Sequence, residues 1–347
     1  MSWPEARHHH TFSPFGNPFR KIFSTRPHSS PKLLSLLNEF ERMVAASLTN
    51  LTPKESSKVL SLSWMRLAVG SLSEIHTNIN GLITDLQFPV SDWDEKWMNE
   101  YLDGSVKLLD ICIALSSELS QLDKGQLLLH HIMRVMEHSR FSSEQLRLAD
   151  ASLRDWNERF SSKNRKLKSC DDLLLVTPFG KTKDSYKGRV LIRALYGVKA
   201  VIVIVCGVIT SALSGCAKNL LELHVPDVFL WSRAFRGLQT VVLSEIRSHL
   251  SSEKVIVLKE LEAVELCVER LSRLTHCLCG GEEAAARQKE GRKLEELVSD
   301  LAECSEKLSE GLDLLLSQID GFFRIVVSGR DALLSNLRAS SPMREDP

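Results

Sequence analysis

The chain has 347 residues with 44 basic and 44 acidic side chains, so it carries no net charge that would attract nucleic acid or an anionic membrane. Hydrophobic residues make up 43% of it and charged residues 25%, which is typical of a soluble globular protein and excludes wholesale disorder. With only 17 glycines and 11 prolines, collagen-like and low-complexity chains are excluded as well.

The first segment, residues 1–32, contains five prolines, five Lys or Arg and a single acidic residue. This composition predicts a disordered N-terminal arm. The shortage of acidic residues is also typical of an organelle transit peptide, although the prolines interrupt the amphipathic helix that such peptides form. A short docking motif at residues 14–19 is the third interpretation.

From residue 33 the apolar residues recur at steps of three and four, which predicts a helix. Thr52 followed by Pro53 and Glu55 has the pattern of a capped helix start, so we expect a second helix there that ends before Pro89. Residues 91–94 repeat the capping pattern and open a further helix. We expect Gly125 to separate this helix from an apolar run at 127–136. Another helix is predicted to end near Phe160.

Residues 161–188 interrupt the helical pattern and form the best candidate for a basic loop or hinge. Between Arg159 and Lys199 there are eleven Lys or Arg and three Asp, whereas 253–320 holds sixteen acidic and nine basic residues. We expect the two segments to attract each other within the fold. The alternative is that the basic segment meets lipid headgroups or RNA.

An apolar helix is predicted at about 189–222, because residues 200–217 contain no charged side chain. Eighteen residues reach about 27 Å as a helix, just short of the hydrocarbon thickness of a bilayer. Gly207, Ser211 and Gly215 lie four apart and form a ridge of small residues that lets two helices approach closely. Two interpretations stay open: a buried central helix, with this ridge as its packing face, and a membrane-spanning or membrane-dipping helix.

The last segment has the clearest periodicity, with apolar residues at near-heptad spacing from Leu294 to Val326. It predicts either a coiled-coil surface for a partner or, as we prefer, a helix packed inside the protein's own bundle. Gly311, Gly321 and Gly329 would each weaken a free helix by about 1 kcal/mol relative to alanine. Residues 340–347 are expected to be a disordered tail.

A search for chemistry gives no site. Residues 180–182 imitate the end of a phosphate loop, but Leu175 stands where its first glycine is needed. His276, Cys277 and Cys279 lack the second pair of ligands that structural zinc requires, and we interpret them as a helix end closing on Gly280. We therefore expect no catalytic residue, no cofactor and no metal.

Several strings along the chain together resemble the plant BYPASS family over residues of about 14–338. The strings are PFGNPF (14–19), ITDL (83–86), PVSDW (89–93), YLD (101–103), VKLLD (106–110), RALYGVK (193–199), SGRD (328–331) and NLR (336–338). The resemblance implies a helical plant protein acting in development, which restrains production of a root-derived mobile signal that arrests shoot and root growth. It implies no catalytic residues, and it leaves both plastids and membranes open as locations.

Together these observations predict an all-α protein: a bundle of long antiparallel helices at 33–339 that follows the disordered arm. We expect an intracellular, non-enzymatic regulator of root and shoot development that acts by contact with a protein partner not yet known, without nucleic acid and in an oligomeric state that the sequence does not reveal. The alternatives are an enzyme or small-ligand carrier in the signal pathway, using a cavity between helices, and a scaffold anchored in a membrane through 200–217.

Overall fold

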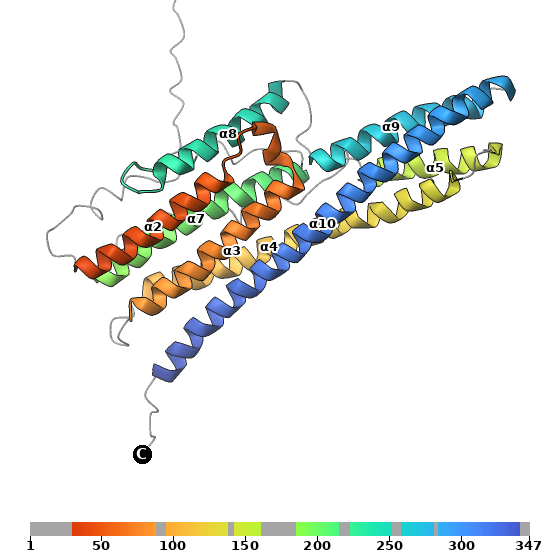
Figure 1. The fold of residues 1–347 in the computed structure, drawn as a ribbon. Coiled ribbons are helices and arrows are strands. Elements are labelled where there is room, and N and C mark those ends of the chain that lie inside the picture. Colours follow the sequence, from red (N-terminus) through yellow and green to blue (C-terminus); the bar gives the residue numbers. More distant parts are fainter. Residues whose placement is uncertain are drawn as a thin grey trace, which may run out of the picture.

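The computed structural model describes residues 30–87, 95–137, 142–160, 185–214, 223–251, 258–280 and 284–340. Within these ranges every regular element is helical, which confirms the all-α fold (Figure 1). The elements are α2 (Pro31–Leu51), the 3-10 helix η1 (Ser56–Leu60), α3 (Leu62–Asp85), α4 (Glu95–Val135), α5 (Ser143–Phe160), α7 (Tyr186–Ser214), α8 (Ser232–Ser251), α9 (Lys259–Gly280) and α10 (Ala284–Ser340).

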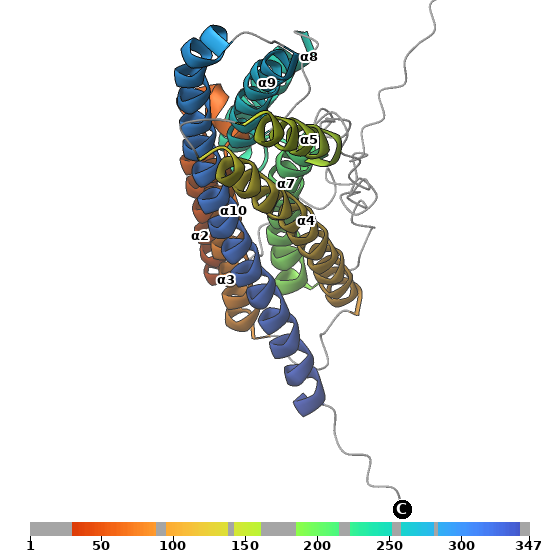
Figure 2. The ribbon, with the colours of Figure 1, turned by 90° about the vertical axis from the view of Figure 1, so that its right-hand side faces the viewer.

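Two groups of helices share α4 and α10, which run the length of the molecule (Figure 1). One group contains α2, α3, α7 and α8, and the other contains α5 and α9. With 57 residues, α10 is about 85 Å long. It contacts α9, α4 and α3, and its C-terminal end extends past the other helices in both views (Figures 1 and 2). The two long helices therefore join the groups into one elongated body.

Side-chain contacts fix the directions of the helices around α10. Arg330 bonds to the carbonyl oxygen of Leu102, and Ser305 bonds to Gln126, so α4 and α10 are antiparallel. Leu62 faces Gly311 and Asn80 faces Gly329, so α3 runs parallel to α10. Both directions therefore occur among the neighbours of α10, which the sequence periodicity did not distinguish.

The second helix begins later than predicted. Thr52 is the C-terminal cap of α2, and its hydroxyl donates to the carbonyl of Leu48 at 2.9 Å. η1 follows, and Ser61 caps α3 by accepting a hydrogen bond from the Trp64 amide at 3.3 Å. The prediction was wrong because a 3-10 turn with its own capping residues intervenes between two amphipathic helices.

The predicted break at Gly125 is also wrong, because α4 is continuous from Glu95 to Val135. A Cβ atom at Gly125 would lie 3.0 Å from Phe160 Cγ and 3.4 Å from Trp156 Nε1. The glycine therefore provides close approach for the aromatic end of α5 rather than a helix end.

The near-heptad residues of α10 pack against α3, α4 and α9, as expected for a helix within the protein's own bundle. Most of the predicted positions are buried: Leu294, Leu301, Leu308, Leu312, Leu315, Ile319, Phe322 and Val326. The sequence predicted that the basic segment is attracted to the acidic residues of 253–320. The ion pairs described for α7 are made with other helices instead. Arg193 pairs with Glu41 of α2, and Lys199 pairs with Glu100 of α4.

Two glycines of α10 should respond oppositely to the same substitution. In Gly311→Ala the new Cβ would lie 2.7 Å from Leu62 Cδ1 and 3.1 Å from Leu62 Cβ. We expect overpacking to exceed the helix-propensity gain and to lower the free energy of unfolding by about 1–2 kcal/mol. No atom lies within 4 Å of a Cβ atom at Gly321, so Gly321→Ala should raise the free energy of unfolding by about 1 kcal/mol. Urea titration of both variants measures the difference, and a loss of stability in Gly321→Ala would contradict the packing described here.

Candidate functional site

A groove of about 480 Å³ lies between α3, α4 and α7. It is the space left where α3 and α4 both pack against α10 and against α7. Its apolar lining comes from all three helices: Ile79, Val106, Leu108, Ile111, Leu195, Val198, Ile202 and Val203. A volume of this size is typical of pockets for small molecules.

Four charged side chains of balanced sign also line the groove. Glu100, Asp103 and Lys107 stand on α4, and Lys199 stands on α7. Lys199 Nζ lies 2.9 Å from Glu100 Oε2, so this ion pair joins the two walls. Since two of these groups are acidic and two are basic, they add no net charge to the groove.

Gly104 leaves the α4 wall open. It lines the groove one helical turn from Glu100 and Leu108, and no atom lies within 4 Å of a Cβ built there. Residues three and four apart share one face of a helix, so a larger side chain at 104 would enter the groove.

His76 is one of the buried polar residues that line this groove. The residue is 5% exposed, and its Nε2 atom has no hydrogen-bond partner within the part of the chain that the structure describes. Its ring meets the Phe322 ring edge-on, with 5.1 Å between the centroids. Burial lowers the pKa of His76 from 6.5 to about 4, so the imidazole is neutral at pH 7.

Hydrogen bonds between α3, α4 and α10 fix the end of the groove next to Tyr101. The Tyr101 hydroxyl donates to Asn80 Oδ1 at 2.7 Å, and burial raises its pKa to about 12. Arg330 Nη1 donates to the Leu102 carbonyl at 2.7 Å and to Ser105 Oγ at 3.0 Å. These contacts hold the first turns of α4 on the bundle.

The α7 wall is anchored by a buried ion pair. Arg193 Nη2 donates to Glu41 Oε2 at 3.2 Å and to the Val228 carbonyl at 2.8 Å, while Arg193 Nε also donates to Glu41. The Leu230 amide donates to the same carboxylate at 2.8 Å. The pair therefore joins α2, α7 and the segment before α8.

Aromatic packing adds to this anchor. The Tyr196 and Phe229 rings stack with centroids 4.9 Å apart, and Phe229 stacks on Trp231 at 5.0 Å. A Cβ at Gly197 would lie 3.2 Å from Trp231 Nε1, so a glycine is needed for this approach.

Strings from three distant parts of the sequence thus meet around one groove. Residues 101–110 and 193–199 form two of its walls, and Gly329 and Arg330 contact Asn80 and Leu102 beside it. These segments hold four of the eight strings on which the resemblance to the BYPASS family rests, and their positions show that these four belong to one structural unit.

Comparison with known proteins agrees with the resemblance found in these strings. The model of the family described as Protein ROH1-like matches residues 18–171 and 161–337. The chain is 42% identical over 332 residues to Protein BPS1, chloroplastic, of Arabidopsis thaliana, covering 94% of this chain and 91% of that protein. The chain belongs to the ROH1-like family. The resemblance to the BYPASS family is thereby confirmed.

Two further relatives show how widely the ROH1-like sequence varies. UPF0496 protein 4 of Oryza sativa subsp. japonica is 51% identical over 281 residues, covering 79% of this chain and 62% of that protein, so the chain spans less than two thirds of its length. Protein ROH1D of Arabidopsis thaliana is 20% identical over 349 residues, covering 85% of this chain and 86% of that protein. No solved structure matches the chain.

The predicted ridge of small residues lies only partly within the described residues of this ROH1-like chain. Gly207 and Ser211 are buried, and the Ser211 hydroxyl donates to the Gly207 carbonyl of its own helix at 2.7 Å. Gly215 lies outside the described residues. The helix at Tyr186–Leu213 has the length and composition of a membrane span. Its most apolar 18 residues have a mean hydropathy of 2.1, and 78% of that stretch is buried inside the protein.

Other predicted features have equally plain outcomes. The string at 14–19, residues 89–94 and the imitation of a phosphate loop at 180–182 lie outside the described residues. α7 begins at Tyr186, so the last three residues of the predicted hinge are helical. Cys277 and Cys279 are exposed free thiols in the last turn of α9, which ends at Gly280 as expected.

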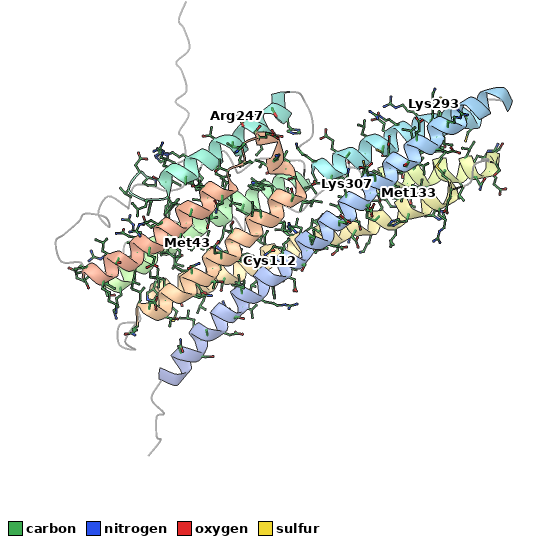
Figure 3. All side chains as sticks on the ribbon, viewed as in Figure 1. Met43, Cys112, Met133, Arg247, Lys293 and Lys307 are labelled. Carbon is green, nitrogen blue, oxygen red and sulfur yellow. The ribbon has the colours of Figure 1, made fainter. Side chains whose placement is uncertain are left out.

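Sequence reasoning missed His76 and Gly104. His76 shares a helix face with Leu72, Ile75 and Ile79, so a polar residue within an apolar stripe was the available signal. Cys112, labelled on α4 in Figure 3, is buried next to Ile111. Burial raises the pKa of its thiol to about 12, so it is a packed thiol rather than a nucleophile at neutral pH.

Proposed function

We propose that this protein regulates plant development by restraining production of a root-derived mobile signal that arrests shoot and root growth. Membership of the ROH1-like family and the 42% identity with Protein BPS1 over nearly the full chain support this role. The action proposed is contact with a protein partner rather than turnover of a substrate.

An exposed apolar stripe on α4 is the observation that carries the contact proposal. Val106, Ile113 and Leu127 are 42%, 59% and 72% exposed. They are spaced by seven and fourteen residues, so they lie on one side of the helix. A row of large apolar side chains in water favours a protein partner that covers them.

A small-ligand carrier is the second candidate, because the groove between α3, α4 and α7 has the volume of a ligand pocket. We propose an intracellular location. The name of the Arabidopsis relative, chloroplastic, supports a plastid. The burial of most of the apolar window of α7 supports a core helix in place of a membrane span.

Complementation tests the function and the surface together. Arabidopsis plants lacking Protein BPS1 would receive this protein, a double variant Ile113→Glu/Leu127→Glu, or the control Leu67→Glu/Leu314→Glu. The control residues are 51% and 50% exposed and lie on α3 and α10. Wild-type shoots grafted onto these roots report the mobile signal.

We expect the unchanged protein and the control to restore shoot growth, and the α4 variant to fail although it accumulates to the same level. If the unchanged protein fails, the assigned function is wrong. If the α4 variant restores growth fully, the protein does not act through this stripe.

A further inference from the structure

Two cysteine side chains meet where α9 packs against α10. Cys267 stands on α9 and Cys304 on α10, 37 positions apart in the chain, and their sulfur atoms lie 3.8 Å apart. Both thiols are free. The two helices are consecutive in the chain and lie side by side (Figure 1). The fold therefore holds two thiols in contact across a helix–helix interface.

The two thiols differ in their exposure. Cys267 is 7% exposed, whereas Cys304 is half-buried and packs against the hydrophobic core from its edge. A small oxidant in solution therefore reaches Cys304 first. Cys267 needs no access to solvent for the following step, because the sulfur that it has to attack is already its neighbour.

The ionisation of Cys267 favours the same order of events. The pKa of its thiol is raised to about 11, chiefly by burial and also by the contact with Cys304, while the charge of Arg270 offsets part of the rise. Few Cys267 thiols are ionised at pH 7, so this thiol is protected from direct oxidation. A reaction partner held in contact compensates for the small ionised fraction, because it acts at a high effective concentration.

We propose that Cys267 and Cys304 are a site of reversible thiol oxidation, at which a small disulfide such as oxidised glutathione causes a covalent link between α9 and α10. The Cys304 thiolate first attacks one sulfur of the oxidant, which forms a mixed disulfide and releases one glutathione. The Cys267 thiolate then attacks the Cys304 sulfur and releases the second glutathione. The two protein thiols lose two electrons and two protons, and the two glutathione molecules take them up.

The link would fasten the second group of helices to α10. The sulfur atoms need to approach each other by only roughly 2 Å to reach bonding distance, a shift that the two side chains can share. The bond would restrict the unfolded chain between the two cysteines, and α9 also carries the contact with α5. Neither the groove nor the α4 stripe takes part, so this inference and the proposed function can fail separately.

Peptide mapping tests the bond itself. The purified full-length protein is kept overnight with oxidised glutathione at about pH 8, its remaining thiols are blocked with N-ethylmaleimide, and it is digested with trypsin. The two cysteines lie in separate tryptic peptides, 260–270 and 294–307, whereas Cys277 and Cys279 share the peptide 274–287. We expect peptides 260–270 and 294–307 to be joined, and dithiothreitol to separate them.

Two variants test the order of the steps. In Cys267→Ser the second nucleophile is missing, so glutathione should stay attached to Cys304. The control Cys279→Ser removes an exposed thiol at the end of α9 and should form the link as the unchanged protein does. The proposal is overturned if Cys277 and Cys279 acquire glutathione while 260–270 and 294–307 stay separate. It is also overturned if the linked peptides come only from dimers on a non-reducing gel.

Thermal unfolding tests the fastening of α9. We expect the oxidised protein to unfold about 5 °C or more above the reduced protein, because the link closes a long loop in the unfolded chain. The same shift should occur in Cys279→Ser and be absent in Cys267→Ser. A linked protein that unfolds at the same temperature as the reduced one would show that the bond does not hold α9 on α10.

Discussion

Replacing Glu41 by alanine is expected to lower the free energy of unfolding by about 3 kcal/mol, because it takes the charged partner away from the largely buried Arg193 guanidinium. The Glu41 carboxylate is fully buried and accepts hydrogen bonds from Arg193 and from the Leu230 amide. Without it, the guanidinium retains the Val228 carbonyl and the Phe229 ring, whose centroid lies 5.2 Å away. Neither of these neutral groups replaces the charge-assisted hydrogen bonds of the carboxylate.

Urea titration followed by far-ultraviolet circular dichroism measures this loss as a lower midpoint at an unchanged slope. The matched control is Glu269→Ala, which removes an ion pair to Arg273 at 2.9 Å whose side chains are 62% and 68% exposed. Exposed pairs on a helix contribute little, so the control should unfold close to the unchanged protein. Equal midpoints for the two variants would show that the Glu41 pair does not hold α2, α7 and the 228–231 segment together.

Helical periodicity predicted the fold class because each helix buries a continuous apolar face. Such a face requires apolar residues at steps of three and four, which can be recognised in the sequence. Helix ends were less predictable. Thr52 has the residue type of an N-terminal cap but is the C-terminal cap of α2, because a hydroxyl group can form a hydrogen bond at either end of a helix. The 3-10 helix η1, which follows, has no periodic signal in the sequence. Gly125 resembles a break, yet it only accommodates Phe160.

The site depends on pairs that the sequence does not mark. Glu41 and Arg193 are 152 positions apart, and Ser305 and Gln126 are 179 apart, so only the fold brings them together. The groove itself exists because α3 and α4 are held apart where both pack against α10 and α7. No local sequence pattern encodes this separation. The family strings identified the right segments, but the reason they belong together became visible only in three dimensions.

Acidification should destabilise the protein through His76 before most carboxylates are protonated. Burial lowers the folded-state pKa of His76 to about 4, against 6.5 in the unfolded chain. Between these values the unfolded chain binds a proton that the folded protein does not, so the free energy of unfolding falls as the pH falls. His76 costs no stability well above pH 6.5, and the loss in the free energy of unfolding grows below that pH to about 3 kcal/mol by pH 4.

Comparison with His76→Phe isolates this contribution, because phenylalanine keeps an aromatic ring against Phe322 but does not titrate. The carboxylates are the same in both proteins, so their effect cancels in the difference. We expect the urea midpoint of the unchanged protein to fall more steeply than that of the variant from pH 6.5 towards pH 4. Parallel curves would mean that His76 takes up its proton in the folded state, and its nitrogen would then have to be accessible to water through the groove.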